Sequence, residues 1–467
     1  MTNLLLNHLT FLENFGHSQR SPSYAYQPQD PEQIVELFRL VKKEGTSIIT
    51  RGAGRSYNDV ALNGSGVVMD MQGMNRIQEW DKETGLIRAE PGVTLQKLWQ
   101  RVLPDGWWPP VVSGTMFTTL AGCVGMNIHG KNNYRMGTIG EHVQEFTAIL
   151  PTGAEVTCSP HINADLFYAM IGGMGLLGVF TSIKIQMKRV YSGLLNVHAW
   201  NVPNLAAGLN DILNHAPKND YIVGWLDCTT NGHSLGRGQL HTANYLHDGE
   251  DPDSKRTMTV DYQTLPDTIF GLLPKSMLYR IMTPFLNNPG VWMVNVVKYH
   301  AGRERTYHQS HAGFHFLMDY IPNWEMAYGR GGLIQYQSFL PKNTALDAWT
   351  EMLNLSLRRG LPSYLGVTKR HRPDMFLLSH SVDGFSLALD FKVTNSNRSK
   401  LSIMLEEFDQ IVLEAGGRFY FAKNSETTSQ SARRFLGDET IARFHKLKKR
   451  CDPDGLLRSD LFRRIFG

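Results

Sequence analysis

The sequence has few of the residues that mark secreted, metal-binding or nucleic-acid-binding proteins. Only four of its 467 residues are cysteines, and none of them forms a C-x-x-C pair or stands at metal-ligand spacing from a histidine. We therefore expect reduced thiols and no bound metal. The formal net charge of +4 is small and comes without a run of lysine or arginine. Nucleic acid is therefore not expected as the main partner.

Long hydrophobic runs are also missing. No stretch approaches the ~18 apolar residues that a membrane-spanning helix needs, and the N-terminus MTNLLLNHLTFLENF lacks the basic region and small-residue cleavage site of a signal peptide. We expect a cytoplasmic protein, at most peripheral at the inner face of the membrane. Residues 269–286 are apolar with a few cations and contain two prolines. This pattern fits buried interdomain packing, which we favour, or docking on a membrane surface.

Glycine, in contrast, is abundant. The 43 glycines exceed the usual share of about 7%, and many fall before residue 180, in the loops 51–59, 113–130 and 172–179. Glycines let backbone N–H groups turn toward an anion and let the chain lie close to a flat ring system. Three such loops in one unit favour a diphosphate attached to a large planar cofactor. The alternative is that they are only tight turns.

Two better-known nucleotide sites fit these loops poorly. The stretch LAGCVGMNIHGKNNYRMG (120–137) nearly contains G-x-x-x-x-G-K-[ST], but Asn132 stands where a hydroxyl must bind magnesium. Gly52 and Gly54, with Asp70 after a strand, suggest a dinucleotide-binding fold. However, Tyr57 replaces the third glycine, and RSYNDVALNGSG has no helical period from which to build a βαβ crossover.

The pattern of elements predicts two regions. Up to about residue 195 it predicts a mixed α+β unit: a helix from Asp30 to Gly45, strands at 47–50 and 66–70, a helix at 94–103 capped by Thr94, two strands within 145–158, and a helix, glycine turn and strand within 163–187. From about 196 to 414, alternating strands predict an antiparallel sheet. Residues 247–263 have no period and are expected to form a mobile loop.

Several motifs resemble one known family. They run in the order RGAGRSY, PGVTLQKLW, LAGCVGMNIHGKN, PTGAEV, DLFYAMIGGMGLLGVFTSIKI, QYQSFLP, GLPSYLGVTK, LALDF, GGRFYFAKNS and DPDGLLRSDL. This set resembles the vanillyl-alcohol oxidase type of FAD-dependent oxidoreductases over nearly the whole chain. The resemblance implies an α+β fold with two domains: an FAD-binding domain of the PCMH type, formed by 1–195 and completed by 415–467, and an antiparallel-sheet substrate domain at 196–414.

The resemblance also implies which residues contact FAD. They are Gly52, Ala53, Gly54, Arg55, Ser56 and Asn58 in the first loop, Gly114, Thr115, Gly122, Cys123 and Asn127 in the second, Gly173, Gly178 and Val179 near the adenosine, and Tyr420 from the C-terminal segment. Some relatives bind FAD covalently through a histidine where this chain has Arg55. Arginine cannot form that bond, and HGKNNYRMG offers no cysteine, so the resemblance implies non-covalent FAD.

For the chemistry, the resemblance places His129, Lys131 and Lys423 around the flavin ring and the reacting sugar, with Tyr57 beside them. Gln335, Gln337 and Lys369 would line the sugar-phosphate pocket. Which group accepts the hydroxyl proton is left open, because a lysine base needs a lowered pKa. Two positions of SLALDF depart from relatives: Ala388 replaces a cysteine, and Ser386 replaces an asparagine.

Members of this branch of the family oxidise the 2′-hydroxyl of a polyprenyl-phosphoryl ribose to a 2′-keto sugar, which is the first half of a 2′-epimerisation. A separate NAD(P)H-dependent short-chain reductase would complete the reaction. The same activity is expected here. Two alternatives remain: a sugar, aldonolactone or other alcohol oxidase of the same family, and a non-catalytic flavin- or nucleotide-binding protein.

Overall fold

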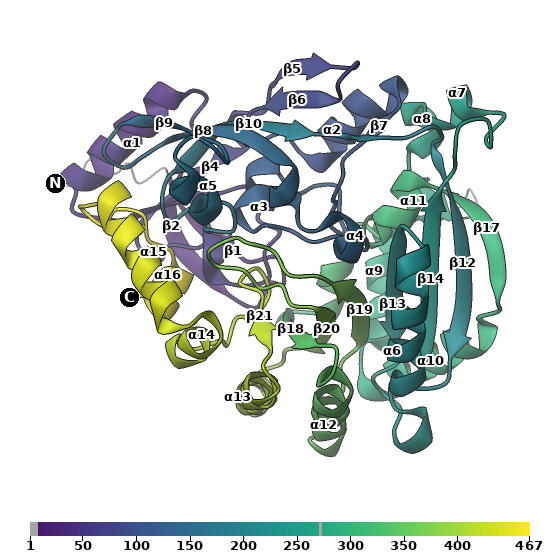
Figure 1. Cartoon of the computed structure of the whole chain (residues 1–467). Coiled ribbons are helices and arrows are strands. Elements are labelled where there is room, and N and C mark those ends of the chain that lie inside the picture. Colours follow the sequence, from purple (N-terminus) through teal and green to yellow (C-terminus); the bar gives the residue numbers. More distant parts are fainter. Residues whose placement is uncertain (1–7, 270–272) are drawn as a thin grey trace.

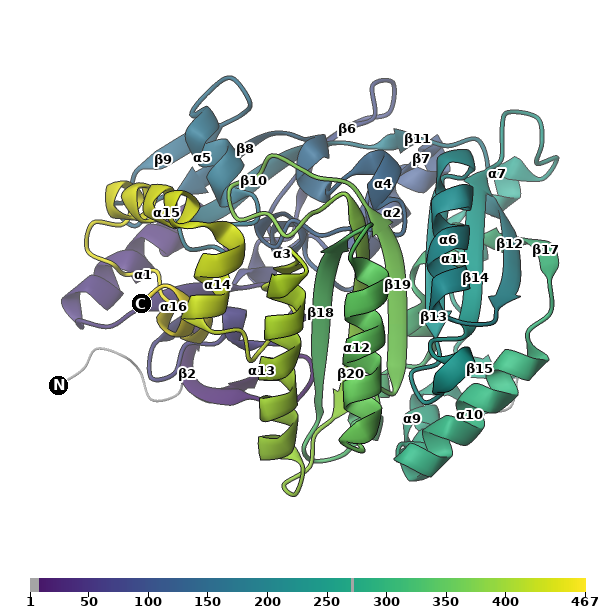
Figure 2. The same ribbon diagram turned by 60° about the horizontal axis from the view of Figure 1, so that its bottom comes forward.

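A large antiparallel sheet separates the N-terminal region from a layer of helices. The structure is a computed structural model, and it describes residues 8–269 and 273–467. The N-terminal region lies on one side of the large sheet, and helices α6, α12 and α13 lie on the other (Figures 1 and 2). This arrangement of mixed helices and antiparallel sheets confirms the expected α+β class.

Two sheets make up the N-terminal region. The first has the order β1 (Leu9–Glu13), β2 (Arg20–Tyr26), β4 (Val67–Asp70), β3 (Ile48–Arg51). The second has the order β5 (Ile77–Asp81), β6 (Leu86–Ala89), β10 (Val179–Gln186), β8 (Val143–Ile149), β9 (Glu155–Cys158). Beside them, β7 (Trp107–Trp108) pairs with β11 (Lys188–Arg189). The helices of this region are α1 (Pro31–Lys43), α2 (Leu95–Val102), α3 (Leu120–Gly125), α4 (Asn133–Met136) and α5 (Ala164–Met170).

The helix boundaries predicted in this region are confirmed. The Asp30 side chain accepts a hydrogen bond from the backbone N–H of Gln33, and Gly45 ends the turn after α1 with φ of +64°. Thr94 caps α2 by accepting from the N–H of Lys97. β3 and β4 pair in parallel, with only a 3-10 turn (Asp59–Ala61) between them. The sequence predicted that no helix connects these two strands, but it did not predict that they pair in parallel.

The large sheet has eight antiparallel strands. Their order is β17 (Arg305–Ser310), β12 (Leu194–Val202), β14 (Gly238–Tyr245), β13 (Tyr221–Leu226), β19 (Leu365–His371), β20 (Gly384–Lys392), β18 (Leu333–Pro341), β21 (Arg418–Phe419). One face is covered by α6 (Leu205–His215), α12 (Ala345–Arg358) and α13 (Arg398–Glu414), as Figure 2 shows. The other face of the sheet is turned toward the N-terminal region, and the candidate site lies between this region and the sheet.

Two segments of the middle region differ from expectation. Residues 247–263, predicted as a mobile loop, contain α7 (Ser254–Thr257) and α8 (Val260–Gln263). The buried Gln263 amide fixes them by donating to the carbonyls of Gly193 and Thr257, both at 2.8 Å. The sequence missed this because the contact with Gly193 comes from outside the segment.

The second segment is 269–286, of which residues 270–272 lie outside the described part. Its described residues include β15 (Thr268–Ile269) paired with β16 (Leu273–Pro274), and α9 (Leu278–Met282), followed by α10 (Asn288–Ala301) and α11 (His311–His315). Met277, Ile281 and Phe285 are exposed. The favoured expectation of buried packing is wrong for these side chains.

The C-terminal segment joins both regions. β21 extends the large sheet and α14 (Ser429–Leu436) packs beside α13, whereas α15 (Asp438–Cys451) and α16 (Asp460–Ile465) lie against the N-terminal region (Figure 1). The Ile48 N–H donates to the carbonyl of Leu456 at 2.8 Å, beside β3. The division into 1–195, 196–414 and 415–467 remains our proposal.

Among residues 8–269 and 273–467, no helix has the length and hydropathy to cross a membrane. The same residues contain no group of three or more His, Cys, Asp or Glu side chains arranged to hold a metal ion.

We predict that one buried ion pair holds the C-terminal segment in place. Lys448 donates to Asp452 at 2.6 Å and to the carbonyls of Leu176 and Leu457, and the Asp452 side chain is 0% exposed. Asp452→Ala leaves this ammonium buried and unpaired, so the free energy of unfolding should fall by ~3–5 kcal/mol in chemical denaturation.

The matched control is Asp454→Ala, two residues away. Asp454 pairs with Lys42 at the surface, where both side chains are largely exposed. This substitution should change the free energy of unfolding by no more than about 1 kcal/mol. Equal effects of the two substitutions would contradict the assignment.

Candidate active site

The candidate site is one large cavity between the N-terminal region and the large sheet. Its volume is about 1180 Å³, at or above the upper end of the ~300–1,000 Å³ typical of small-molecule sites. Part of the lining comes from residues 52–57 and 113–119 and from most residues of 121–126 and 174–179. Strands of the large sheet supply the opposite wall. A ligand of cofactor size would therefore touch both regions.

The first glycine loop follows β3 and touches the second loop directly. A Cβ added at Gly52 would lie 2.1 Å from Oγ1 of Thr119, so only glycine permits this contact. Gly54 has φ of +65°, in the left-handed region that favours glycine. The Arg55 guanidinium stacks over the rings of Phe15 and Phe117 at 5.0 and 5.6 Å. The two aromatic rings therefore hold Arg55 at the wall of the cavity.

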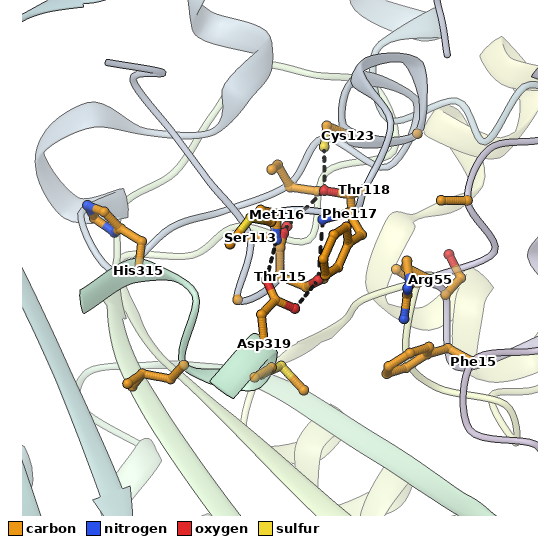
Figure 3. Close-up of a pocket in the computed structure, with 18 of the residues that line it drawn as sticks. Phe15, Arg55, Ser113, Thr115, Met116, Phe117, Thr118, Cys123, His315 and Asp319 are labelled. Carbon is orange, nitrogen blue, oxygen red and sulfur yellow. Dashed lines mark hydrogen bonds between the residues drawn. The ribbon is translucent and has the colours of Figure 1, made fainter. Parts of the chain in front are cut away.

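The second loop is fixed by a half-buried carboxylate from the middle region. Asp319 accepts hydrogen bonds from Oγ1 of Thr115 at 2.6 Å and from the N–H of Met116 at 2.7 Å (Figure 3). Burial raises the pKa of Asp319. Thr118 receives a further bond from the Cys123 thiol, whose pKa burial raises to about 12. The loop is thus ordered by the protein alone.

The C-terminal segment returns across the first loop and brings a lysine into the cavity. The Tyr57 N–H donates to the carbonyl of Ala422 at 2.8 Å. The Asn58 amide donates to the carbonyls of Phe421 and Asn424 at 2.6 and 3.2 Å. As a result, Nζ of Lys423 lies 3.8 Å from the centre of the Tyr57 ring.

The opposite wall is a set of cross-strand rows. Gln337 on β18 pairs with Ala388 on β20, which pairs with Val367 on β19. In the neighbouring rows, Gln335 faces Asp390, and Ser386 faces Lys369. Because side chains alternate along a strand, these residues share one face of the sheet. Amides and a lysine therefore cover the cavity side of the sheet.

Three half-buried lysines that line the cavity dominate the electrostatics of the site. Burial lowers the pKa of Lys131 to about 7 and the pKa of Lys369 to about 8. The pKa of Lys423 is also lowered, chiefly by burial, while the Asp390 carboxylate opposes this shift. Burial raises the pKa of Asp390 in turn, and its side chain accepts from the Gln335 amide. Lys423 can thus exist as a neutral amine near neutral pH.

His129 lies at the centre of a cluster of uncharged rings. Its Nε2 lies 3.1 Å from the amide nitrogen of Gln337, and the rings of His371 and His380 lie 4.8 and 5.4 Å away between centroids. Burial, followed by the neighbouring Lys369, lowers the pKa of His129 well below its usual value. Its Nδ1 has no hydrogen-bond partner among the described residues. His129 is therefore neutral, with a nitrogen available for a ligand.

The structure brings most of the predicted site residues to this cavity. All those predicted for chemistry and substrate binding line it, and so do twelve of those predicted for the cofactor: Gly52, Ala53, Gly54, Arg55, Ser56, Gly114, Thr115, Gly122, Cys123, Gly178, Val179 and Tyr420. Lys131 is the unusual member of the set, because its ammonium donates to the carbonyls of Phe314 and His315.

Three predicted cofactor residues do not line the cavity. Asn58 holds the C-terminal return, as described above. Asn127, with φ of +45°, accepts from the N–H of Gly140 at 3.0 Å. Gly173 is packed against backbone, because an added Cβ would lie 2.3 Å from the carbonyl oxygen of Ala169. These residues brace the loops, and their contact with FAD stays a prediction.

Sequence reasoning missed several polar residues at or next to the site: Asp319, Asp390, His371, His380 and Lys275. Two of them could have been found from the alternation of side chains along a strand. Asp390 follows Ser386 on the same face of β20, and His371 follows Lys369 on the same face of β19. The others come from segments that only the tertiary fold brings to the cavity.

The residues present fit FAD. The loops enclose a cavity that reaches from the glycines to a polar sheet wall, and Nε of Arg55, the hydroxyl of Tyr57 and Nδ1 of His129 are buried without partners among the described residues. Loops 52–56 and 113–119 would hold the diphosphate, and Tyr420 and His129 would lie at the ring. The unpartnered atoms mark places where a ligand's polar groups would bind.

Comparison with known proteins gives the family. A family model described as FAD binding domain matches residues 22–159. The decaprenylphosphoryl-beta-D-ribose oxidase of Mycolicibacterium smegmatis is 30% identical over 467 residues, which cover 97% of each chain. This chain belongs to the same family of FAD-dependent oxidoreductases.

Other relatives in the family are more distant or match less of the chain. A Streptomyces coelicolor protein encoded in the mprA 5′ region is 27% identical over 80% of this chain and 100% of its own. The L-gulonolactone oxidase of Mus musculus is 27% identical over 36% of this chain and 37% of its own. The expected family, the FAD cofactor and the oxidoreductase class are thereby confirmed.

We predict that Gly52→Ala separates the first two loops and weakens FAD binding. The added methyl group would overlap Oγ1 of Thr119, and overpacking of this kind costs ~1–3 kcal/mol. The dissociation constant of FAD, measured by fluorescence on the reconstituted apoprotein, should rise by about tenfold or more.

Gly64→Ala serves as the control, because the nearest atom to its added Cβ is 3.6 Å away, in ordinary contact. It should leave FAD affinity unchanged. Unaltered affinity in the Gly52→Ala protein would show that the contact between the loops does not support the cofactor.

Proposed function

We propose that the protein oxidises the 2′-hydroxyl of a polyprenyl-phosphoryl ribose to the 2′-keto sugar. This would be the first half of a 2′-epimerisation that leads to an arabinose donor for cell-wall arabinan, and a separate NAD(P)H-dependent short-chain reductase would complete it. The observation that carries the proposal is the sheet wall, where the buried Gln335 and Gln337 stand beside the half-buried Lys369. Amides suit sugar hydroxyls, and a half-buried ammonium suits a phosphate. The family membership and the name of the Mycolicibacterium relative support the substrate class.

The residues around the cavity suggest how the hydroxyl is activated. Bound FAD supplies the acceptor for the hydride from the carbon that bears the hydroxyl. Lys423, whose pKa is lowered, accepts the hydroxyl proton at Nζ. The pKa of Tyr57 is raised well above 10 by burial, so its phenol stays protonated and donates a hydrogen bond. Gln335 and Gln337 orient the sugar, and Lys369 pairs with the phosphate.

We also infer that FAD is bound without a covalent bond. Arg55 cannot attach to the flavin, and the thiol of Cys123 is held protonated by burial. A thiol with a raised pKa is a poor nucleophile. The substrate's lipid tail implies that the protein works beside a bilayer, as a peripheral protein in the cytoplasm.

A second candidate is oxidation of a free sugar or aldonolactone. The partial similarity to L-gulonolactone oxidase favours it. A free sugar or aldonolactone carries no phosphate, so its oxidation would need no cation to bind one. The presence of Lys369 in the cavity therefore favours the phosphorylated substrate.

The test of the proposed function is the identity of the oxidised carbon. Holoenzyme incubated with farnesylphosphoryl ribose should form a ketone that borodeuteride converts to sugar labelled with deuterium at C2′. The 2′-deoxy analogue should bind but remain unoxidised. Label at another carbon, or turnover of an aldonolactone with release of hydrogen peroxide, would refute the proposal.

We predict that Asp390, through the pKa of Lys423, sets the pH at which the rate of the reaction rises. Because the Lys423 pKa lies below the ordinary 10.5, the rate of flavin reduction should rise with pH through that lowered value. Asp390→Asn removes the carboxylate that favours the charged lysine, so the rising limb should move to lower pH by about one unit. Lys423→Arg cannot lose its proton and should abolish the rise.

Asp409→Asn is the matched control. Asp409 is also a buried carboxylate, but it accepts from the Tyr336 hydroxyl at 2.9 Å. Tyr336 stands between Gln335 and Gln337 on β18, so it points to the other face of the sheet. The pH profile of this variant should match that of the wild type. A shift equal to that of Asp390→Asn would disprove the specific link to Lys423.

A further inference from the structure

Helix α10 exposes most of its apolar side chains and turns the polar Asn295 inward. Asn295 is buried beside Val291 on the inner side of the helix and donates to the buried Asp227 at 3.0 Å, whereas Lys298 is exposed, with its Nζ 3.9 Å from the ring centre of Trp225. Trp292 and Val297, in contrast, are 53% and 63% exposed. This is the reverse of a surface helix that faces water, whose apolar side packs on the core.

The preceding helix continues the same apolar surface. Met277 in the turn before α9, Ile281 in α9 and Phe285 in the turn after it recur every four residues and are all exposed. Figure 2 shows α9 and α10 together at the lower edge of the molecule. Soluble proteins rarely expose contiguous apolar patches unless they bind something there. We call these residues the α9–α10 surface: Met277, Ile281, Phe285, Trp292, Met293, Val294 and Val297.

Hydrogen bonds hold this surface to the large sheet. Nζ of Lys392 on β20 donates to the carbonyl of Leu286 at 2.7 Å, between the two helices. The Asn288 amide donates to the carbonyl of Gly360 at 3.0 Å, and the Tyr364 hydroxyl donates to the Asn288 side chain at 2.9 Å. The apolar side chains are therefore presented outward by anchored helices.

The charge of the segment is one-sided. Residues 268–303 contain no aspartate or glutamate but include Lys275, Arg280, Lys298 and Arg303. Arg280 and Arg303 are exposed. Apolar side chains together with lysine and arginine are the composition of helices that lie in the interface of an anionic bilayer. A protein partner would more often face a rim with charges of both signs.

The same segment forms one end of the cavity. Pro274, Ser276 and Met282, at and before α9, and Lys298 on α10 line it, and Pro274 and Ser276 are exposed. A ligand that enters there passes next to the α9–α10 surface.

We propose that the α9–α10 surface docks on an anionic phospholipid bilayer and holds the cavity entrance against it. Where this inference explains substrate entry, it rests on the proposed function. In that case the prenyl chain stays in the bilayer while the sugar phosphate reaches the sheet wall. Docking itself needs only the surface and its charge.

The experiment is sedimentation of the holoenzyme with vesicles. Vesicles of phosphatidylcholine with phosphatidylglycerol should bind it, and added salt should weaken this binding. Ile281→Ser with Trp292→Ser should lower the partition coefficient by tenfold or more, because both apolar side chains leave the bilayer. Arg280→Gln should lower it about fivefold, since one cation near an anionic surface contributes ~1 kcal/mol.

The control is Ile403→Ser on α13, which removes an isoleucine that is 50% exposed, as Ile281 is, but lies on another helix. Its binding should equal that of the wild type. Absence of binding to anionic vesicles, or equal losses in the Ile281 and Ile403 variants, would overturn the proposal. If the same variants instead lost binding to a soluble reductase while no form bound vesicles, the surface would belong to a protein partner, and the proposal would also be wrong.

A water-soluble substrate separates this inference from the proposed function. With farnesylphosphoryl ribose in solution, the Ile281→Ser and Trp292→Ser double variant should retain wild-type activity. With a decaprenyl substrate in vesicles, its activity should fall by about the same factor as its binding. Vesicle binding without oxidation of either substrate would disprove the function but not the docking.

Discussion

The crossing of residues 420–424 over the first glycine loop is the contact on which the site depends. Asn58 and the Tyr57 N–H bind three carbonyls of this returning segment. Asn424 also accepts from the N–H of Gln337 at 2.8 Å. One short stretch thereby joins the N-terminal region, the C-terminal segment and the large sheet. It also brings Lys423 to Tyr57, so the cofactor loops and the reacting groups are positioned by the same hydrogen bonds.

A second constraint is the burial of positive charge. Lys131, Lys369 and Lys423 are all withdrawn from water, and burial disfavours their charged forms. Lys131 is partly compensated by two backbone carbonyls, and Lys423 by Asp390. An anionic ligand would stabilise the remaining charge. A site of this kind suits a flavin and a phosphorylated sugar, whereas a neutral sugar alone would leave the lysines uncompensated.

Much of the N-terminal region could be predicted because its signals are local. Asp30 and Pro31 begin α1, and Gly45 ends it, through contacts within a few residues. The glycine loops could be found in the same way. Whether a polar side chain in such a loop faces a ligand or braces the loop is not a local property. Asn58, which the resemblance places at FAD, also donates to carbonyls of a segment that is distant in the sequence, and only the fold reveals this second role.

The substrate wall and the α9–α10 surface show where sequence reasoning stops. Alternation in SLALDF reveals that Ser386, Ala388 and Asp390 share a face, but only the pairing of β18, β20 and β19 places them beside Gln337 and Lys369. For residues 269–286, the apolar composition predicted burial, but Met277, Ile281 and Phe285 are exposed. The fold instead anchors α10 through Asn295, so the apolar side faces outward.

The central claim is that the cavity recognises a phosphate beside the sugar to be oxidised. It is tested most directly by comparing kcat/KM for farnesylphosphoryl ribose with that for a farnesyl riboside that lacks the phosphate. Loss of the partner of a buried charge costs ~2–5 kcal/mol, so kcat/KM should fall by at least about 30-fold. Equal values for the two substrates would contradict this account.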